Sequence, residues 1–132
     1  MYYYLLITGD MKYTAGVYCA TSSAFLLSTY KTLTLDGLND KGSEFLFIAI
    51  SSFTSLPHAT VVLINNAQAG NVYWSIGSSA TIGDYATMVG SIIAYASITF
   101  NSHSTLSGRG LAGAAITCAS GSTINLALQQ PH

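Results

Sequence analysis

Three segments of the chain repeat one another: Ala80–Gly90 (ATIGDYATMVG), Ile98–Gly108 (ITFNSHSTLSG) and Ile116–Leu126 (ITCASGSTINL). Each segment begins eighteen residues after the previous one, and similar residues fall in the same columns. Two columns are threonine, Thr81/Thr99/Thr117 and Thr87/Thr105/Thr123, and two are apolar, Ile82/Phe100/Cys118 and Met88/Leu106/Ile124. A fixed period of this length with aligned polar and apolar columns is typical of a solenoid.

Local patterns indicate that this solenoid is built from β-strands. In each segment apolar residues flank a threonine, as in Ala80–Ile82, and this alternation over a few residues indicates short strands. Glycine and small polar residues between the strands permit turns. A coil of eighteen residues has room for three short strands and three corners. We therefore predict an all-β protein, a three-sided parallel β-helix whose coils stack about 4.8 Å apart.

The pattern continues upstream with less regularity. Thr54 and Thr60 are six residues apart, like the later threonine pairs, but Thr54 lies nine residues further from Thr81 than one coil requires. The surplus coincides with the polar stretch Asn65–Asn71, which we interpret as a loop inserted at a corner. We predict one β-solenoid domain over residues 1–132, with regular coils at about 54–126. Less regular strands are expected in 1–53 at residues 2–8, 16–19, 32–37 and 45–50, with a solvated loop around 39–42.

Composition excludes several classes of function. Only 7% of residues are charged, 50% are hydrophobic and the net charge is −1, which does not favour nucleic acid or an anionic membrane surface. No apolar run approaches the ~18 residues of a transmembrane helix. Met1–Thr8 is apolar but lacks a basic start and stops at Gly9–Asp10, so an edge strand fits it better than a signal peptide.

The acidic residues do not predict an active site. A β-helix hydrolase or lyase needs acids or a basic residue that converge on one face. Asp84 is the only acid in the regular coils, and Ser102 and Ser120 take its place in the next two. The other carboxylates are Asp10, Asp36, Asp40 and Glu44. We therefore expect no enzyme activity.

Histidine and cysteine do not predict a cofactor or a disulfide. His58 and His103 each lie two residues before a column threonine, so they could be neighbours, whereas His132 stands apart. Two histidines alone are a weak metal signal, and we expect neither metal nor cofactor. Cys118 lies in an inward column and Cys19 about a hundred residues earlier. Because free cysteine behaves as a small buried hydrophobe, we predict that they remain unpaired.

Several segments resemble the microbial and algal ice-binding proteins. Val61–Trp74 (VVLINNAQAGNVYW) resembles their VLINGAQASNVFW, and Ser75–Gly83 (SIGSSATIG) resembles QVGSSATLG. Ser97–Asn101 and Leu106–Ala112 are similar to SITLN and LNGRALA. Upstream, Gly9–Asp10, Gly16–Tyr18 and Leu33–Asp36 match GDL, PGVY and LTLD. The resemblance covers nearly the whole chain, and the order of the motifs is specific.

The resemblance implies a discontinuous right-handed β-solenoid with a long α-helix alongside. In the family, another stretch with the first coils and that helix precedes the Gly-Asp motif. This chain therefore resembles the C-terminal part, without the helix. We then expect an exposed apolar strip that includes Ile93, Tyr95 or Leu111, and a tendency to self-associate. The resemblance also implies secretion. Arg109 matches an arginine of the family, and we expect it to have a corner role, donating to carbonyls of adjacent coils, rather than a catalytic one.

Two functions remain open: ice binding, and a structural or adhesin-type solenoid without ice activity. Threonine ladders do not separate them, because threonine suits any strand. The resemblance favours ice, and some relatives carry a Thr-Ala/Gly-x-Thr/Asn repeat that Ser120–Thr123 resembles. The equivalent segments 84–87 and 102–105 match this repeat less well, because Tyr85 and His103 stand where it has alanine or glycine. We therefore expect a roughened face and modest activity. The preferred site is Thr60, Asp84, Thr87, Ser102, Thr105, Ser120 and Thr123, and the alternative column is Thr54, Thr81, Thr99 and Thr117.

Overall fold

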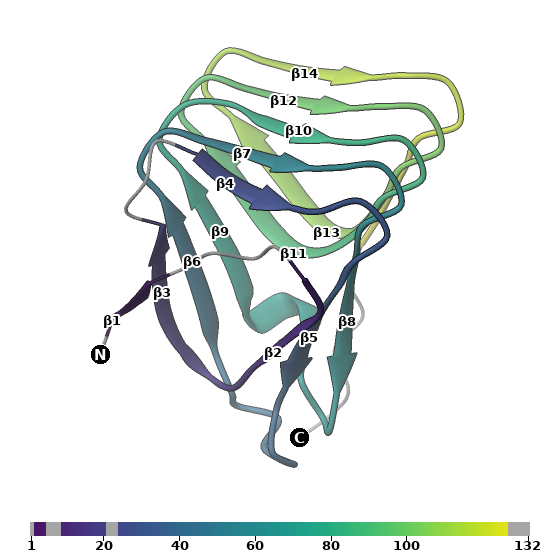
Figure 1. The fold of residues 1–132 in the computed structure, drawn as a ribbon. Helices are drawn as coiled ribbons and strands as arrows, with labels where there is room; N and C mark the ends of the chain where they lie inside the picture. Colours follow the sequence, from purple (N-terminus) through teal and green to yellow (C-terminus); the bar gives the residue numbers. More distant parts are fainter. Residues whose placement is uncertain (1, 5–8, 21–23, 127–132) are drawn as a thin grey trace.

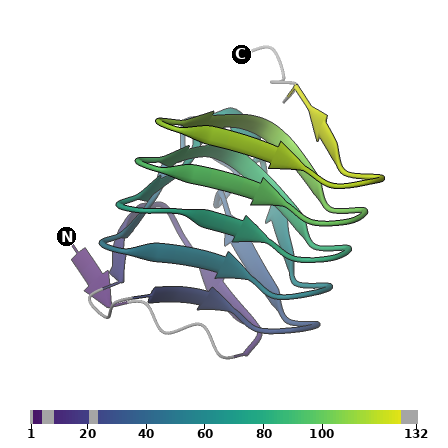
Figure 2. The same ribbon diagram turned by 90° about the horizontal axis from the view of Figure 1, so that it is seen from above.

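The chain winds into stacked three-sided coils. The computed structural model describes residues 2–4, 9–20 and 24–126. Its strands pair only in parallel within the described part, in one sheet of five strands and one of ten that bends around two sides (Figure 1). Viewed from above, the coils lie in layers (Figure 2). The predicted three-sided parallel β-helix is confirmed.

Side 1 is the five-stranded sheet. Its strands are β4 (Ala24–Leu27), β7 (Ser52–Ser55), β10 (Ala80–Ile82), β12 (Ser97–Phe100) and β14 (Ala115–Cys118). Alternate residues face inward, so Phe53, Ile98 and Phe100 are fully buried between partly exposed neighbours. This alternation is the pattern that the sequence predicts.

Sides 2 and 3 share the ten-stranded sheet. Side 2 holds β2 (Met11–Tyr13), β5 (Thr32–Asp36), β8 (Thr60–Ile64), the first halves of β11 (Thr87–Ala94) and β13 (Thr105–Ala112), and β15 (Thr123–Asn125). Side 3 holds β1 (Tyr2–Tyr4), β3 (Gly16–Ala20), β6 (Phe45–Ala49), β9 (Val72–Ile76) and the second halves of β11 and β13. β1 lies at the edge of the sheet as expected for Tyr2–Tyr4, while Leu5–Thr8 fall outside the described residues.

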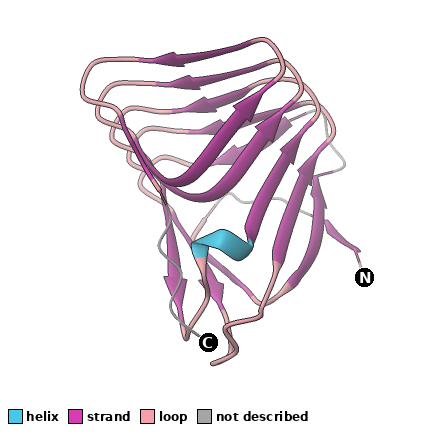
Figure 3. Ribbon diagram, turned by 180° about the vertical axis from the view of Figure 1, so that it is seen from behind, coloured by secondary structure: helices cyan, strands magenta, loops and turns pink. Residues whose placement is uncertain are grey.

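The corner between sides 2 and 3 takes two forms. In the later coils β11 and β13 bend there without interruption at Gly90 and Gly108. Gly90 has φ +103°, and a Cβ atom at this residue would lie 2.5 Å from the carbonyl oxygen of Val72, so only glycine fits. In the earlier coils a loop replaces the bend, at 37–44 and at 65–71, where Figure 3 shows the 3-10 turn η1 (Ala69–Asn71). The predicted corner insertion is thus confirmed.

The ladders begin earlier than the sequence period indicates. Leu26 pairs with Thr54 on side 1, and Thr32 pairs with Thr60 on side 2, so the regular columns reach back to β4 and β5. The two corner loops lengthen these coils and hide the period.

The predicted inward columns are confirmed. Ile82, Phe100, Met88 and Leu106 are fully buried. Cys118 and Ile124 continue the same columns but are exposed, because β14 and β15 form the last described coil. Aromatic rings fill the wider early coils: the ring of Phe47 stacks between Tyr18 and Trp74, at centroid distances of 5.3 and 4.3 Å.

A buried carboxylate ties the two corner loops together. Asp36 is 4% exposed, and its Oδ1 accepts hydrogen bonds from the Leu38 N–H and the Asn65 side-chain amide, at 2.8 and 2.9 Å. These two donors, followed by the ammonium of Lys12 at 3.5 Å, lower the pKa of Asp36. Asp36 therefore has a structural role in the loops and is not available as a catalytic acid.

One core hydroxyl offers a stability test. Among the described residues, Ser55 Oγ is the buried side-chain oxygen without a hydrogen-bond partner. Removing it by Ser55→Ala should raise the free energy of unfolding by about 1 kcal/mol, because an unpaired buried hydroxyl is destabilising. Thermal unfolding followed by circular dichroism measures the change.

Ser104→Ala is the matched control. Ser104 is equally buried, but its hydroxyl donates to the Asn101 carbonyl at 2.7 Å, so its removal should lower stability by about 1 kcal/mol. Equal destabilisation by both substitutions would contradict the assignment of Ser55 as unpaired.

Candidate functional site

The predicted site residues meet at the corner between sides 1 and 2. Each coil makes the same tight turn there, closed for example by the Ala86 N–H, which donates to the Gly83 carbonyl at 3.1 Å. The equivalent bond closes the turns that begin at Ser28, Leu56, Asn101 and Ala119. The corner is therefore a row of five identical turns, one per coil.

Threonines leave these turns in a single ladder. Thr32, Thr60, Thr87, Thr105 and Thr123 pair in succession, and we call them the corner threonine ladder. The N–H groups of Thr87, Thr105 and Thr123 each donate to a carbonyl of the preceding coil at 2.9 Å. These equal bonds hold the ladder at one spacing, as the strand period requires.

All seven residues of the preferred site lie on this corner. Asp84, Ser102 and Ser120 occupy one column of the turns, with Pro57 in the same column one coil earlier. Among the described residues, the hydroxyls of Thr87, Thr105 and Thr123 make no hydrogen bond, so they are available to a ligand. Sequence reasoning missed Thr32, whose step to Thr60 is 28 residues rather than 18. The alternation in Thr32–Leu35 was the signal that pointed to it.

The alternative column forms a second ladder on side 1. Thr54, Thr81, Thr99 and Thr117 pair in register, and we call them the side-1 threonine ladder. The first three are partly exposed and Thr117 is exposed. The structure thus builds both predicted ladders, one along a corner and one along a sheet.

Four aromatic side chains stack along the corner. The rings of Tyr30, His58, Tyr85 and His103 follow one another at centroid distances of 4.5, 5.1 and 4.8 Å, and neighbouring planes are within 6° of parallel. We call them the ring stack. His58 and His103 share a column as expected, but they are not neighbours because Tyr85 lies between them. Among the described residues no group of three or more histidine, cysteine, aspartate or glutamate side chains could hold a metal ion.

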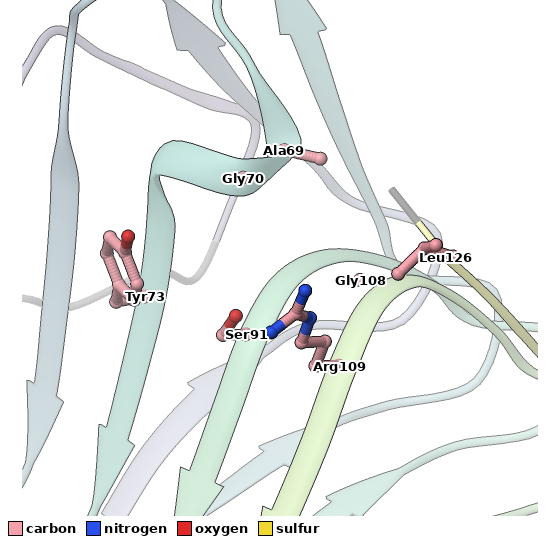
Figure 4. A pocket seen from close by; sticks show the side chains of 7 residues that line it. All are labelled: Ala69, Gly70, Tyr73, Ser91, Gly108, Arg109 and Leu126. Carbon is pink, nitrogen blue, oxygen red and sulfur yellow. The ribbon is translucent and has the colours of Figure 1, made fainter. Parts of the chain in front are cut away.

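Arg109 is exposed on β13, and within the described residues its guanidinium donates no hydrogen bond. The corner role expected for it stays a prediction. Arg109 lines a shallow cavity of about 370 Å³ with Tyr73 and Ser91, next to η1 (Figure 4). The described residues that line it include no acidic side chain.

The outer face of side 3 carries the expected apolar strip. Ile93, Tyr95 and Leu111 are 44%, 82% and 55% exposed, and we call these three residues the apolar strip. They lie on or beside β11 and β13, opposite the corner of the threonines. Both cysteines are free thiols, Cys19 on β3 and Cys118 on β14. No helix in the described part is long and apolar enough to cross a membrane.

Comparison with known proteins identifies the family. A family model described as Ice-binding-like matches residues 5–125. The chain belongs to this family. It is 41% identical over 91 residues to an ice-binding protein of Nostoc sp. (strain HG1), which covers 69% of this chain and 32% of that protein.

Solved structures agree with this assignment. One is an ice-binding protein from an Antarctic biological consortium, with a TM-score of 0.90 and 34% identity over 96% of this chain and 57% of that chain. Another is an ice-binding protein from the Antarctic ascomycete Antarctomyces psychrotrophicus, with a TM-score of 0.83 and 32% identity over 97% and 64%. The chain thus spans about a third of the Nostoc protein and 57–64% of these structures.

Proposed function

We propose that this chain binds ice and slows its growth or recrystallisation through the corner threonine ladder and the column of Asp84, Ser102 and Ser120. The observation that carries the proposal is the row of hydroxyls at Thr87, Thr105 and Thr123, which make no hydrogen bond within the described residues and are held at one spacing by coil-to-coil hydrogen bonds. The hydroxyl of Thr60 differs, because it donates to the His58 carbonyl at 3.5 Å. Membership of the Ice-binding-like family supports it independently.

The ladder has the properties that adsorption to ice requires. Ice presents a regular array of oxygen atoms, so a matching surface must be rigid, repetitive and weakly charged. Threonine offers a methyl and a hydroxyl group with a restricted rotamer, and little entropy is lost on binding. The charged side chains on the described corner turns are Lys31 and Asp84. A structural solenoid would need neither a regular row of free hydroxyls nor this low charge.

A bulky residue in the ladder tests the site. Thr105 lies mid-ladder, so Thr105→Tyr should hold a flat ice surface away from its neighbours and raise the concentration needed to stop recrystallisation about tenfold or more, which corresponds to about 1.4 kcal/mol. The substitution is outward and partly exposed, so the coil should still fold. Recrystallisation assays and circular dichroism measure both effects.

Thr99→Tyr is the matched control on the side-1 threonine ladder, in the same coil and equally part-exposed. It should leave activity near that of the parent. Loss of activity with Thr99→Tyr alone would move the site to side 1. A folded parent without any effect on ice would leave the structural or adhesin-type solenoid as the function.

We infer that the protein works without catalysis and outside the cell. The described carboxylates do not converge, since Asp36 is held in the loops and Asp10 Oδ1 accepts the Thr32 N–H at 2.8 Å. An extracellular location agrees with the resemblance noted in the sequence and with a ligand that forms outside the cell.

We also infer that the apolar strip makes the chain self-associate, because association would remove this exposed apolar surface from water. Replacing Ile93 and Leu111 together by serine should reduce association while leaving the inward side chains of β11 and β13 unchanged. Sedimentation velocity over a range of concentrations measures the effect. A parent chain that stays monomeric at high concentration would refute the inference.

A further inference from the structure

We propose that the ring stack is itself an ice-contacting row that works beside the corner threonine ladder, an inference that rests on the proposed function. The ring residues occupy the turn position where the sequence pattern has alanine or glycine. From the sequence, Tyr85 and His103 were expected to roughen the surface. Their geometry points to the opposite effect.

The stack is rigid. The rings of His58 and Tyr85 are each covered on both faces by neighbouring rings. The backbone below them is fixed as well, because the His58 N–H donates to the Asp84 carbonyl at 2.9 Å and the Tyr85 N–H to the Ser102 carbonyl at 3.0 Å. All four residues have φ between 59° and 62°. Side chains that are already ordered lose little entropy on binding.

The stack is also regular and accessible. Its centroid spacings of 4.5 to 5.1 Å are close to the strand spacing of about 4.8 Å, so the rings repeat with the coils as the threonines do. Tyr30 and Tyr85 are 71% and 53% exposed, whereas Thr60, Thr87 and Thr105 are only partly exposed. A flat surface that rests on this corner must therefore meet the ring edges.

The exposed edges carry suitable chemistry. Stacked rings turn their edges outward, where the phenol hydroxyl can donate and accept and imidazole nitrogens can do either. Carbon–hydrogen edges lie beside these polar groups, so each ring offers the same combination of apolar and hydrogen-bonding surface as a threonine. The row ends at Gly121, which has no side chain to continue it. A Cβ atom at residue 121 would lie only 2.6 Å from His103 Cδ2, so the His103 ring covers this glycine closely.

Removing the central ring tests the contribution. Tyr85→Gly deletes the ring, and glycine accepts the φ of 59° as Gly121 accepts 77°. We expect the variant to need about three times more protein to stop recrystallisation, or about 0.7 kcal/mol by the same conversion. Tyr85→His, which keeps a ring of the kind found at residues 58 and 103, should lose less activity than Tyr85→Gly. Circular dichroism near 0 °C checks that both variants are folded.

The outcomes distinguish this inference from the proposed function. A folded Tyr85→Gly variant with equal or higher activity would show that the rings obstruct the surface, and would overturn the inference while leaving ice binding intact. A folded parent without ice activity would instead remove the proposed function, and this inference with it.

Discussion

The structure depends on hydrogen bonds between successive coils. Each coil pairs in parallel with the next, so every equivalent residue must sit one strand spacing above the last. This constraint turns a sequence repeat into a ladder of like side chains. It buries the apolar columns and exposes the threonine columns. At the corner between sides 1 and 2 the same bonds fix the turns, so that the free hydroxyls and the aromatic rings repeat together.

The corner between sides 2 and 3 absorbs the variation in coil length. A glycine bend at Gly90 and Gly108 keeps the later coils at eighteen residues, whereas loops at 37–44 and 65–71 widen the earlier ones. The wider coils hold the large rings of Phe47 and Trp74 in the core. Length therefore varies away from the threonine corner, and the surface proposed to meet ice keeps one geometry in short and long coils.

This division explains what the sequence could predict. The eighteen-residue period fixed the columns of the later coils, including the inward Met88 and the outward Thr105. It could not reveal Thr32 or Tyr30, because the loop at 37–44 lengthens their coil to 28 residues. The ring stack was missed for another reason: it joins residues of different type, and Tyr85 separates the two histidines. The corner role of Arg109 stays a prediction, because within the described residues its guanidinium donates no hydrogen bond.

The most direct test of the claim that this corner binds ice is to find out which planes of an ice crystal the protein adsorbs to. A single ice crystal is grown slowly in a dilute solution of the fluorescently labelled chain, and its surface is then imaged under ultraviolet light. A rigid, regularly spaced row should match particular lattice planes, so we predict fluorescence on a defined set of crystal surfaces. A folded protein that the growing crystal excludes evenly, with no fluorescent planes, would contradict the claim that this corner binds ice.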